Sequence, residues 1–539
     1  MAIIRCRERD SVDCMLRFSG QRCVSTLRSF IGSGLLVALL ACGVTPAQTY
    51  PLKIEDRAIE NPYVLHARDW PPTLGLPNAA MMRTNAGERW FQIETARGVF
   101  SPTFGNLFLP DAGWVAMAVK SHTDLTYTFN TVPAWAAHES GSAPANVAPY
   151  DIDAKDEVCV APLAGKVSVD GNCIWKEWVT ALMQKNCAVS AEPVRPLTGR
   201  CQIHSFEAWN EFNAGLFWQD SIKHLAKMAN DMAVIVRTYC GDCTVVAGST
   251  SAGGVGRAGD GVSGSGDFVI ALSELLDAWH AIPNASLPNV VSYHAYPSRT
   301  NVVYPPFPET NISANDPKCT FANVPNDFCK YSIVDQPGVL RRMLESRSYL
   351  PTAIPVWNTE SGWNTNKTLL HDVDATGHAD AVTGFLRQAF LARETILLAN
   401  EGVAVNLWYE ADHQCTGTLY GFGEPDTGPN MRSCPNDPVI PEGLTPAGQA
   451  LVTLHGWLHG GTFTGPCQSK GTVWWCPISG PATGQGILAW TTKWETAEPG
   501  TLLPATFRYA HALDGTTAEL RPGEKPLLEI RPRLFNNLR

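Results

Sequence analysis

Two glutamates, Glu211 and Glu360, stand where an acid and a base could work together. Glu211 closes the stretch FEAWNE (206–211), and Glu360 closes IPVWNTE (354–360). Each follows a short segment rich in aromatic and β-branched residues, which is typical of a β-strand. A pair of opposed carboxyl groups can cleave a glycosidic bond, because one protonates the leaving oxygen while the other attacks or activates water. Either glutamate alone would equally suit a solvated strand end or a helix N-cap.

The elements that would position these glutamates alternate along the chain. Between residues 60 and 460, β-rich apolar segments alternate with helical patterns, which predicts an α/β fold with a parallel sheet. Eight such units indicate a (β/α)₈ TIM barrel. The expected strands are 61–67, 79–84, 124–129, 204–211, 244–249, 289–296, 354–360 and 402–410. The clearest expected helices are 175–185, 220–239, 267–281, 338–349, 380–399 and 445–458.

In a TIM barrel the functional residues project from the carboxyl ends of the strands. Glu211 ends the fourth expected strand and Glu360 the seventh, so the two carboxylates would face each other across the barrel mouth. Arg83, His294 and Tyr296 end other strands. We expect Arg83 and Tyr296 to keep Glu360 ionised, which leaves Glu211, between aromatic neighbours, as the better general acid.

Two further side chains are placed by the two-residue period of a strand. Glu207 is expected to point into the barrel, where a buried carboxylate needs a partner, so a structural salt bridge is favoured over catalysis. Trp408 shares its expected face with Asn406, and we expect it to point inward as a sugar-stacking floor. For Asn210 to reach the same site as Glu211, the strand must end or bulge there.

These motifs resemble those of retaining glycoside hydrolases of clan A. FEAWNEFN looks like their fourth-strand signature, and VWNTESGW looks like their nucleophile segment. Within the clan, WFQIETARGVF, YTFNTVPAWAA, AWNEFN and TESGW are most similar to family 39, which includes β-xylosidases and α-L-iduronidases. The resemblance covers roughly residues 60 to 460. One departure is Phe212, because the family usually has proline after Asn-Glu.

The resemblance implies a double displacement on a β-glycoside, with Glu360 as nucleophile and Glu211 as acid/base. Their carboxyl groups would lie about 5 to 5.5 Å apart. Asn210 would bind the hydroxyl beside the anomeric carbon, while Arg83, His294 and Tyr296 would orient Glu360 and the sugar. A carbohydrate substrate, with xylosides as one candidate, and no cofactor are therefore expected. The alternative is a barrel that binds glycans without cleaving them.

Beyond Gly460 the pattern changes to short alternating runs separated by turn residues, such as GTVWWCP and GILAWTTKW. This change predicts a small accessory C-terminal β-sandwich. The expected organisation is therefore a signal peptide over 1–47, a catalytic barrel over 48–459 and the β-sandwich over 460–539.

The N-terminal residues read as an export signal. Arginines precede the apolar run FIGSGLLVALLACGV, which is too short for a spanning helix, so no stable membrane insertion is expected. Cleavage after Ala47 is favoured over lipidation at Cys42, and both predict a secreted or periplasmic protein. The formal charge is −10, and the first 47 residues carry six Arg, no Lys and three acidic residues, so the remainder carries 35 − 48 = −13. Such a surface does not favour nucleic acid as a partner. The oligomeric state is left open.

Twelve cysteines remain after residue 47, an even number that suggests disulfides in an exported chain. Sequence leaves their connectivity open, although pairing of sequence neighbours would give six short loops. They are Cys159, Cys173, Cys187, Cys201, Cys240, Cys243, Cys319, Cys329, Cys415, Cys434, Cys467 and Cys476.

Three other motifs carry weaker readings. The glycines of GGVGRAG (253–259) have GxGxxG spacing, but they neither follow a strand directly nor open a helix, so a dinucleotide site is disfavoured. The CGDC at 240–243 has no second ligand pair at zinc spacing, and HDVDATGHAD (371–380) is better explained as a solvated loop. We therefore expect no metal.

Overall fold

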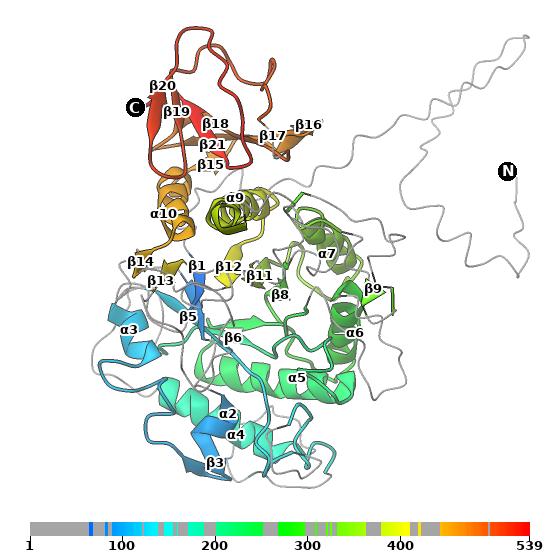
Figure 1. Ribbon diagram of the computed structural model, residues 1–539. Helices are drawn as coiled ribbons and strands as arrows, with labels where there is room; N and C mark the ends of the chain where they lie inside the picture. The colour runs from blue at the N-terminus through cyan, green and yellow to red at the C-terminus, as the bar shows by residue number, and fades with distance from the viewer. Residues whose placement is uncertain are drawn as a thin grey trace, which may run out of the picture. The chain divides into compact units, whose positions relative to one another are not determined.

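An eight-stranded parallel sheet lies at the centre of the computed structural model, with helices around it (Figure 1). Its strands are β1 (Val64–Ala67), β2 (Met81–Thr84), β5 (Asp124–Thr128), β6 (Ser205–Glu207), β7 (Thr244–Val246), β8 (Val291–His294), β11 (Val356–Ser361) and β12 (Val405–Tyr409). All eight fall within the segments expected to be strands, or one residue beyond them. The structure describes residues 64–67, 81–84, 89–120, 123–137, 145–154, 159, 171–187, 201–251, 268–296, 308–309, 320–321, 324–325, 331–362, 379–409, 419–421, 442–493 and 496–539.

The strand order is β7-β6-β5-β2-β1-β12-β11-β8, and every adjacent pair is parallel. The order follows the chain in both directions from β1, as expected when each strand is laid beside the previous one. Two isolated parallel bridges, Val246 to Val290 and Ser251 to His294, link the segments that carry the end strands β7 and β8.

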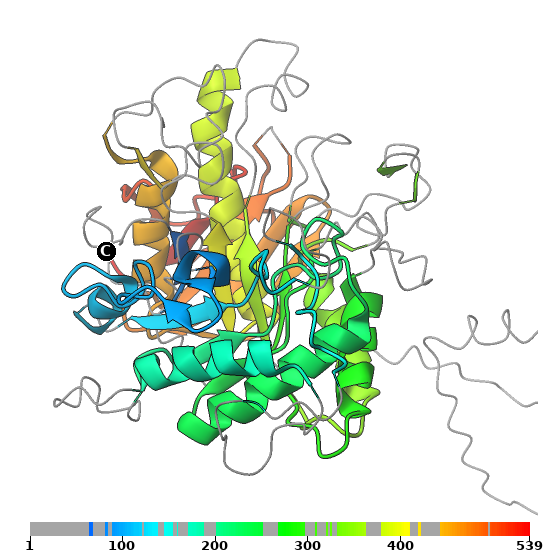
Figure 2. The same ribbon diagram turned by 90° about the horizontal axis from the view of Figure 1, so that it is seen from below.

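The helices that follow the strands form the outer layer. They are α3 (Trp114–Lys120), α4 (Cys173–Asn186), α5 (Ile222–Tyr239), α6 (Phe268–His280), α7 (Gln336–Glu345), α9 (Ala379–Asn400) and α10 (Pro446–Leu458). Figure 2 shows α4 and α5 lying side by side, with α9 beside α10. Six of these match the expected helices to within a few residues at each end.

Local sequence explains where two of these helices begin. The Ser221 hydroxyl accepts a hydrogen bond from the backbone N–H of His224, and Thr445 does the same for Gly448. Such N-caps satisfy one of the amide groups that the first turn leaves without a partner. Pro446 follows Thr445 at the first helical position, where proline is well tolerated.

The sheet buries both faces. On one face, which we call the inner face, Met81, Val246, Val290, Trp357 and Leu407 form a small apolar cluster. On the opposite, outer face, a much larger cluster joins strand residues such as Leu125, Phe206 and Val291 to helix residues. Near-continuous burial of this kind is expected for a parallel sheet between other elements.

Shorter elements surround this core, and a second sheet lies after α10. The short ones are α2 (Trp90–Ile93), β3 (Glu94–Ala96), β4 (Val99–Phe100), β9 (Thr320–Phe321), β10 (Val324–Pro325), β13 (Tyr420–Gly421) and β14 (Gly443–Leu444). The C-terminal strands are β15 (Thr462–Phe463), β16 (Gln468–Lys470), β17 (Val473–Gly480), β18 (Gly484–Thr491), β19 (Tyr509–His511), β20 (Thr517–Glu519) and β21 (Arg533–Asn536). All seven are antiparallel members of one hydrogen-bonded sheet, so the expected change to β structure after Gly460 is confirmed, while a two-layered sandwich stays a prediction.

Buried side chains connect the C-terminal sheet to α9 and α10. Leu488 and Trp490 of β18 share an apolar cluster with Ile396 of α9 and Leu454 of α10. Beside them, Arg393 of α9 forms a buried ion pair with Glu309, and the Trp490 indole N–H donates to Glu309 Oε1 over 2.7 Å.

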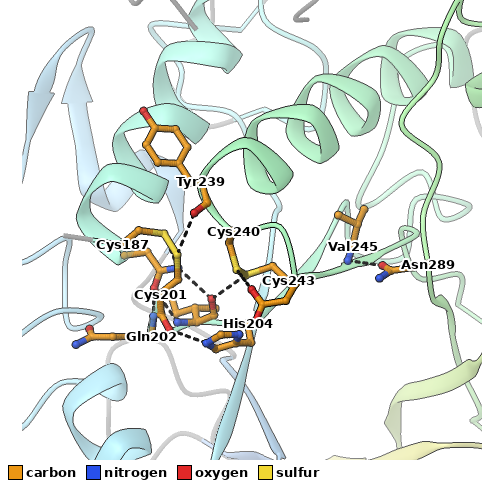
Figure 3. The surroundings of a disulfide bond; sticks show 12 residues. Cys187, Cys201, Gln202, His204, Tyr239, Cys240, Cys243, Val245 and Asn289 are labelled. Atoms are coloured by element: carbon orange, nitrogen blue, oxygen red, sulfur yellow. Dashed lines mark hydrogen bonds between the residues drawn. A yellow bond between two sulfur atoms is a disulfide. The ribbon is translucent and has the colours of Figure 1, made fainter. Parts of the chain in front are cut away.

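Four disulfides join sequence neighbours, namely Cys159–Cys173, Cys187–Cys201, Cys240–Cys243 and Cys467–Cys476. Two of them lie together beside His204, where β6 and β7 begin, and His204 Nε2 lies 2.6 Å from the carbonyl oxygen of Cys201 (Figure 3). Because the sulfurs of Cys240 and Cys243 are bonded to each other, they offer no thiolate to a metal. The remaining four expected cysteines lie outside the described residues.

Several other expectations also fall outside the described residues. These are the signal over 1–47 with Cys42, the glycine-rich motif at 253–259 and the segment 371–380. Within the described part of the chain, no helix combines the length and the apolar character needed to cross a membrane.

Candidate active site

Five polar side chains from four strands meet at the carboxyl-terminal edge of the parallel sheet. They are Arg83 on β2, Asn210 and Glu211 after β6, His294 at the end of β8, and Glu360 on β11. Tyr296, two residues beyond β8, joins them. The parallel strands bring together residues that are up to 277 positions apart in the chain. This convergence is the one expected from the sequence.

The chain leaves β6 in a conformation that turns Glu211 toward the site. β6 ends at Glu207, four residues earlier than expected, but the chain stays hydrogen-bonded to the end of β7 and to the segment after it. The amide of Ala208 donates to the Val246 carbonyl over 3.0 Å, and that of Phe212 to the Ser249 carbonyl over 3.2 Å. Glu211 itself has a φ of 42°, in the left-handed region that non-glycine residues rarely adopt. Strain of this kind is typical of functional sites.

Glu360 owes its direction to a bulge in β11. The pairing register shifts between Asn358 and Glu360 on the β8 side, and between Asn358 and Ser361 on the β12 side. As a result, the consecutive residues Thr359 and Glu360 lie on the same side of the sheet, where Thr359 contacts Glu207 and Glu360 contacts Arg83. In a regular strand they would point to opposite faces. Gly362 follows β11, and a Cβ atom there would lie 2.1 Å from the Tyr409 carbonyl oxygen, so only glycine fits.

Two donors hold the Glu360 carboxylate. Arg83 Nη1 donates to Oε2 over 2.7 Å, and the Tyr296 hydroxyl donates to Oε1 over 2.5 Å. Burial, followed by the charge of Glu360, raises the pKa of Tyr296 well above its usual value, so this phenol stays a donor. Both oxygens of Glu360 are therefore engaged by donors, and its side chain is 15% exposed at the site.

A buried carboxylate, Glu207, holds Arg83 from the opposite side. Its Oε2 accepts from Arg83 Nη2 and from Thr128, each over 2.8 Å. Its Oε1 accepts from Ser292 over 2.7 Å and from Thr359 over 2.8 Å. Although burial opposes its charge, Arg83 and these donors keep the pKa of Glu207 below the ordinary value. The expected structural salt bridge of Glu207 is confirmed, and the hydrogen bonds of this carboxylate tie β6 to four other strands.

Arg83 is shared by two carboxylates, Glu207 and Glu360. Burial works against the Arg83 cation, but Glu207 and Glu360 together keep its pKa above the ordinary value. Arg83 Nη2 also donates to Asn210 Oδ1 over 2.5 Å, which fixes the side chain next to Glu211. One guanidinium thus orients two acids and an amide with its planar fork of donors.

Glu211 meets a different partner. Its Oε1 lies 2.8 Å from His294 Nδ1, and the same nitrogen lies 3.8 Å from Glu360 Oε2. One carboxylate oxygen of Glu211, one of Glu360 and one ring nitrogen of His294 all lie within 4.8 Å of one another. Such a trio could also ligate a metal, but Glu360 is already paired with the Arg83 cation, and a second cation there would be repelled. The geometry suits proton transfer better than metal binding.

No family model matches the chain, and no curated protein matches it. Its fold is similar to that of a family 39 glycoside hydrolase. That structure, from the gut symbiont Bacteroides cellulosilyticus WH2, has a TM-score of 0.54 and 17% sequence identity, over 89% of this chain and 82% of that one. The resemblance expected from the motifs is thus found in the fold.

Two other solved structures are less similar to the chain. A family 44 endoglucanase from Clostridium thermocellum has a TM-score of 0.43 and 11% identity, over 88% of this chain and 96% of that one. A family 30 xylanase from Talaromyces cellulolyticus has a TM-score of 0.42 and 10% identity, over 89% and 96%.

The structure places Trp408 away from the other expected site residues. Its neighbour Leu407 belongs to the inner cluster, and successive strand side chains point to opposite faces, so Trp408 points outward. There it is 3% exposed, in the same core cluster as Leu391 of α9 and Leu451 of α10. The prediction of a sugar-stacking floor took Asn406 and Trp408 as inward residues, whereas the strand presents Leu407 inward instead.

Two sets of residues near the site escaped the sequence reasoning. Tyr409 lies close enough for its charge to affect Tyr296, and it shares the inward parity of Leu407. Alternation along β12 would have predicted Tyr409 if it had been known that Leu407 points inward. Behind β11, Asn358 and Ser361 form a hydrogen-bonded group with α9, for which the sequence gives no signal because it depends on the bulge.

Proposed function

We propose that this protein is a retaining glycoside hydrolase that cleaves β-glycosidic bonds by double displacement. The observation that carries the proposal is the pair of carboxyl groups of Glu211 and Glu360, whose nearest oxygens lie within 4.8 Å. Retaining enzymes hold their two carboxyl groups about 5 to 5.5 Å apart, and inverting enzymes about 6.5 to 9.5 Å. The short separation favours the retaining mechanism.

The different surroundings of the two acids suggest their roles. Glu360, paired with Arg83 and Tyr296, would attack the anomeric carbon as an anion and form a covalent glycosyl-enzyme. Glu211 would donate its proton to the departing oxygen, and then take a proton from the water that releases the sugar. His294 shares a hydrogen bond with Glu211 and would hold that carboxyl group in place through both steps.

Asn210 and the sheet edge would recognise the sugar. Because Asn210 Oδ1 accepts from Arg83, the orientation of the amide is fixed. Its N–H₂ group would donate to the hydroxyl beside the anomeric carbon. By resemblance to family 39, a β-xyloside is the first substrate to test. A barrel that binds glycans without cleaving them would have less use for two carboxyl groups held this close together.

Three broader features belong to this proposal. We infer that the eight strands close into a barrel, since the bridges between the β7 and β8 segments join the two ends of the strand order. We retain 48–459 as the catalytic barrel and 460–539 as the accessory part, where a β-sandwich would form. We also infer an exported protein, because four disulfides are typical of oxidising compartments.

The proposal is tested with a panel of nitrophenyl glycosides and a matching 2-fluoro glycoside. We expect hydrolysis with retention at the anomeric carbon, observed by NMR, and a covalent adduct on Glu360, located by mass spectrometry of peptides. Glu360→Gln and Glu211→Gln should each lower kcat by at least about a hundredfold. Glu177→Gln, a surface carboxylate paired with Arg97, serves as the control and should retain activity.

Two results would overturn the proposal. Hydrolysis at the parent rate by the Glu360→Gln variant would show that Glu360 is not the nucleophile. Glycan binding by the parent protein without any turnover would instead favour the non-catalytic barrel.

A further inference from the structure

A buried carboxyl group lies behind β11, on the side opposite the candidate site. Glu394 of α9 is fully buried and has no role in the proposed double displacement. Its Oε1 accepts a hydrogen bond from the hydroxyl of Ser361, the residue after the proposed nucleophile. A buried carboxyl group is costly unless it is hydrogen-bonded or neutral, so its presence here calls for a physical reason.

The bulge of β11 divides four consecutive residues between two faces. Thr359 and Glu360 reach Glu207 and Arg83 on the inner side, whereas Asn358 and Ser361 reach the outer side. Across the bulge, Asn358 Nδ2 donates to Ser361 Oγ over 2.7 Å. This bond fastens the two ends of the bulge from behind.

The same group is connected to both neighbouring strands. Asn358 Oδ1 accepts from the backbone N–H of Ala295, between His294 and Tyr296, over 2.8 Å. Asn358 Nδ2 also donates to Asn406 Oδ1 of β12 over 2.5 Å. Glu394 is the point at which this network meets α9, so a change there is transmitted to the strand ends that carry the site.

Burial favours a neutral acid at Glu394, although the hydrogen bonds it accepts favour the charged form. Ser361 donates to Oε1, while Oε2 has no hydrogen-bond partner among the described residues. Burial raises the pKa of Glu394 to about 8, against the smaller effect of the bonds from Ser361 and Asn406. Among the described residues, Tyr293 of β8, Arg341 of α7 and Glu401 after α9 are the charged or titratable groups near this corner. The charges of Arg341, Glu401 and Glu394 all act on the Tyr293 hydroxyl.

We propose that Glu394 is a positioning residue for the nucleophile: as a neutral acid it holds Ser361, and through Ser361 and Asn358 it fixes the bulge that aims Glu360 into the site. This inference rests on the proposed function. It predicts that ionisation of Glu394, which places a charge against α9 and β11, loosens the bulge and misaligns Glu360.

The test measures the rate at which an activated 2-fluoro glycoside labels Glu360, because a dinitrophenyl leaving group departs without help from an acid and the rate reports the nucleophile alone. At neutral pH, Glu394→Gln should label within about twofold of the parent, since the amide is neutral and similar in shape. Glu394→Ala should label about tenfold to a hundredfold more slowly, with its KM nearly unchanged, as expected for a misplaced reacting group. Glu401→Gln is the matched control, a second carboxylate at the end of the same helix.

The pH dependence separates positioning from general damage to the fold. Labelling of the parent and of Glu401→Gln should slow as the pH rises through about 8, whereas labelling of Glu394→Gln should not. If Glu394→Ala does not fold, as judged by circular dichroism, Ser361→Ala breaks the same connection and should show the same slow labelling. Parent-like labelling by Glu394→Ala or by Ser361→Ala overturns the inference. A loss of labelling at alkaline pH that persists in Glu394→Gln overturns it as well. A parent protein that is never labelled refutes the proposed function instead.

Discussion

Arg83 donates from Nη1 to Oε2 of Glu360 over 2.7 Å, and this contact joins the second and seventh strands of the parallel fold. Because Glu207 holds the same guanidinium from below, the position of the proposed nucleophile depends on a buried ion pair beneath it. Charge, hydrogen bonding and backbone bulge therefore act on Glu360 together.

Removal of the Arg83 cation should destabilise the protein as well as inactivate it. In Arg83→Met, Glu207 is left buried without its counter-ion, and we expect the free energy of unfolding to fall by about 3 to 5 kcal/mol. The double variant Arg83→Met/Glu207→Gln should recover part of this loss, because the amide carries no charge. Urea denaturation of the parent, Arg83→Met, Glu207→Gln and the double variant gives the coupling energy, and additive effects would contradict the ion pair as described.

The role of Glu211 predicts a dependence on the leaving group. In Glu211→Ala, kcat should fall by about a hundredfold to ten-thousandfold for an alkyl glycoside, but much less for a dinitrophenyl glycoside. Azide should restore turnover by releasing the glycosyl-enzyme, with a β-glycosyl azide as product. An equal loss for both leaving groups would argue against general acid catalysis by this residue.

The outward position of Trp408 predicts a stability effect rather than a binding effect. Trp408→Leu should lower the free energy of unfolding by about 1 to 3 kcal/mol, since it leaves a space in the core. Its KM should stay close to that of the parent. By contrast, Tyr296→Phe removes a donor to Glu360 and should lower kcat with little effect on thermal stability. Isothermal titration with the reaction product would detect any direct contribution of Trp408 to sugar binding.

Glu394 should make stability depend on pH in a defined direction. Its pKa is about 8 in the folded protein against an ordinary 4.5, so the folded state retains a proton that the unfolded state releases. Its contribution is fully present below about pH 4.5, and it is lost as the pH rises toward 8. Glu394→Gln lacks this loss and should become more stable than the parent by a few kcal/mol near pH 8, but not at pH 4. Urea unfolding at both values measures the difference, and a gap independent of pH would contradict it.

Much of the site followed from strand order alone. Placing Glu211 on the fourth strand and Glu360 on the seventh was sufficient to bring them together, because parallel strands end at one edge. Arg83, His294 and Tyr296 followed for the same reason. None of these required knowledge of side-chain direction within a strand.

Side-chain direction is where the sequence reasoning failed. Regular alternation predicted Trp408 inward, but β12 presents Leu407 inward instead, and the β11 bulge lets the consecutive residues Thr359 and Glu360 act on the same side. A bulge adds one residue to one strand and leaves no distinctive composition. The contact of Glu394 with Ser361 depends on that bulge as well, and on the rotation of α9 about its axis, so a one-dimensional pattern does not contain it.

The buried contact of Glu309 with Arg393 and Trp490 bears on how the molecule comes apart. Helix α9 of the parallel fold and strand β18 of the C-terminal sheet both contact Glu309, and both contribute to one apolar cluster. Their separation would therefore expose buried charge and apolar side chains to water at the same time. We expect a single cooperative melting transition in calorimetry. A chain ended at residue 459 should aggregate rather than yield a smaller, independently folded enzyme.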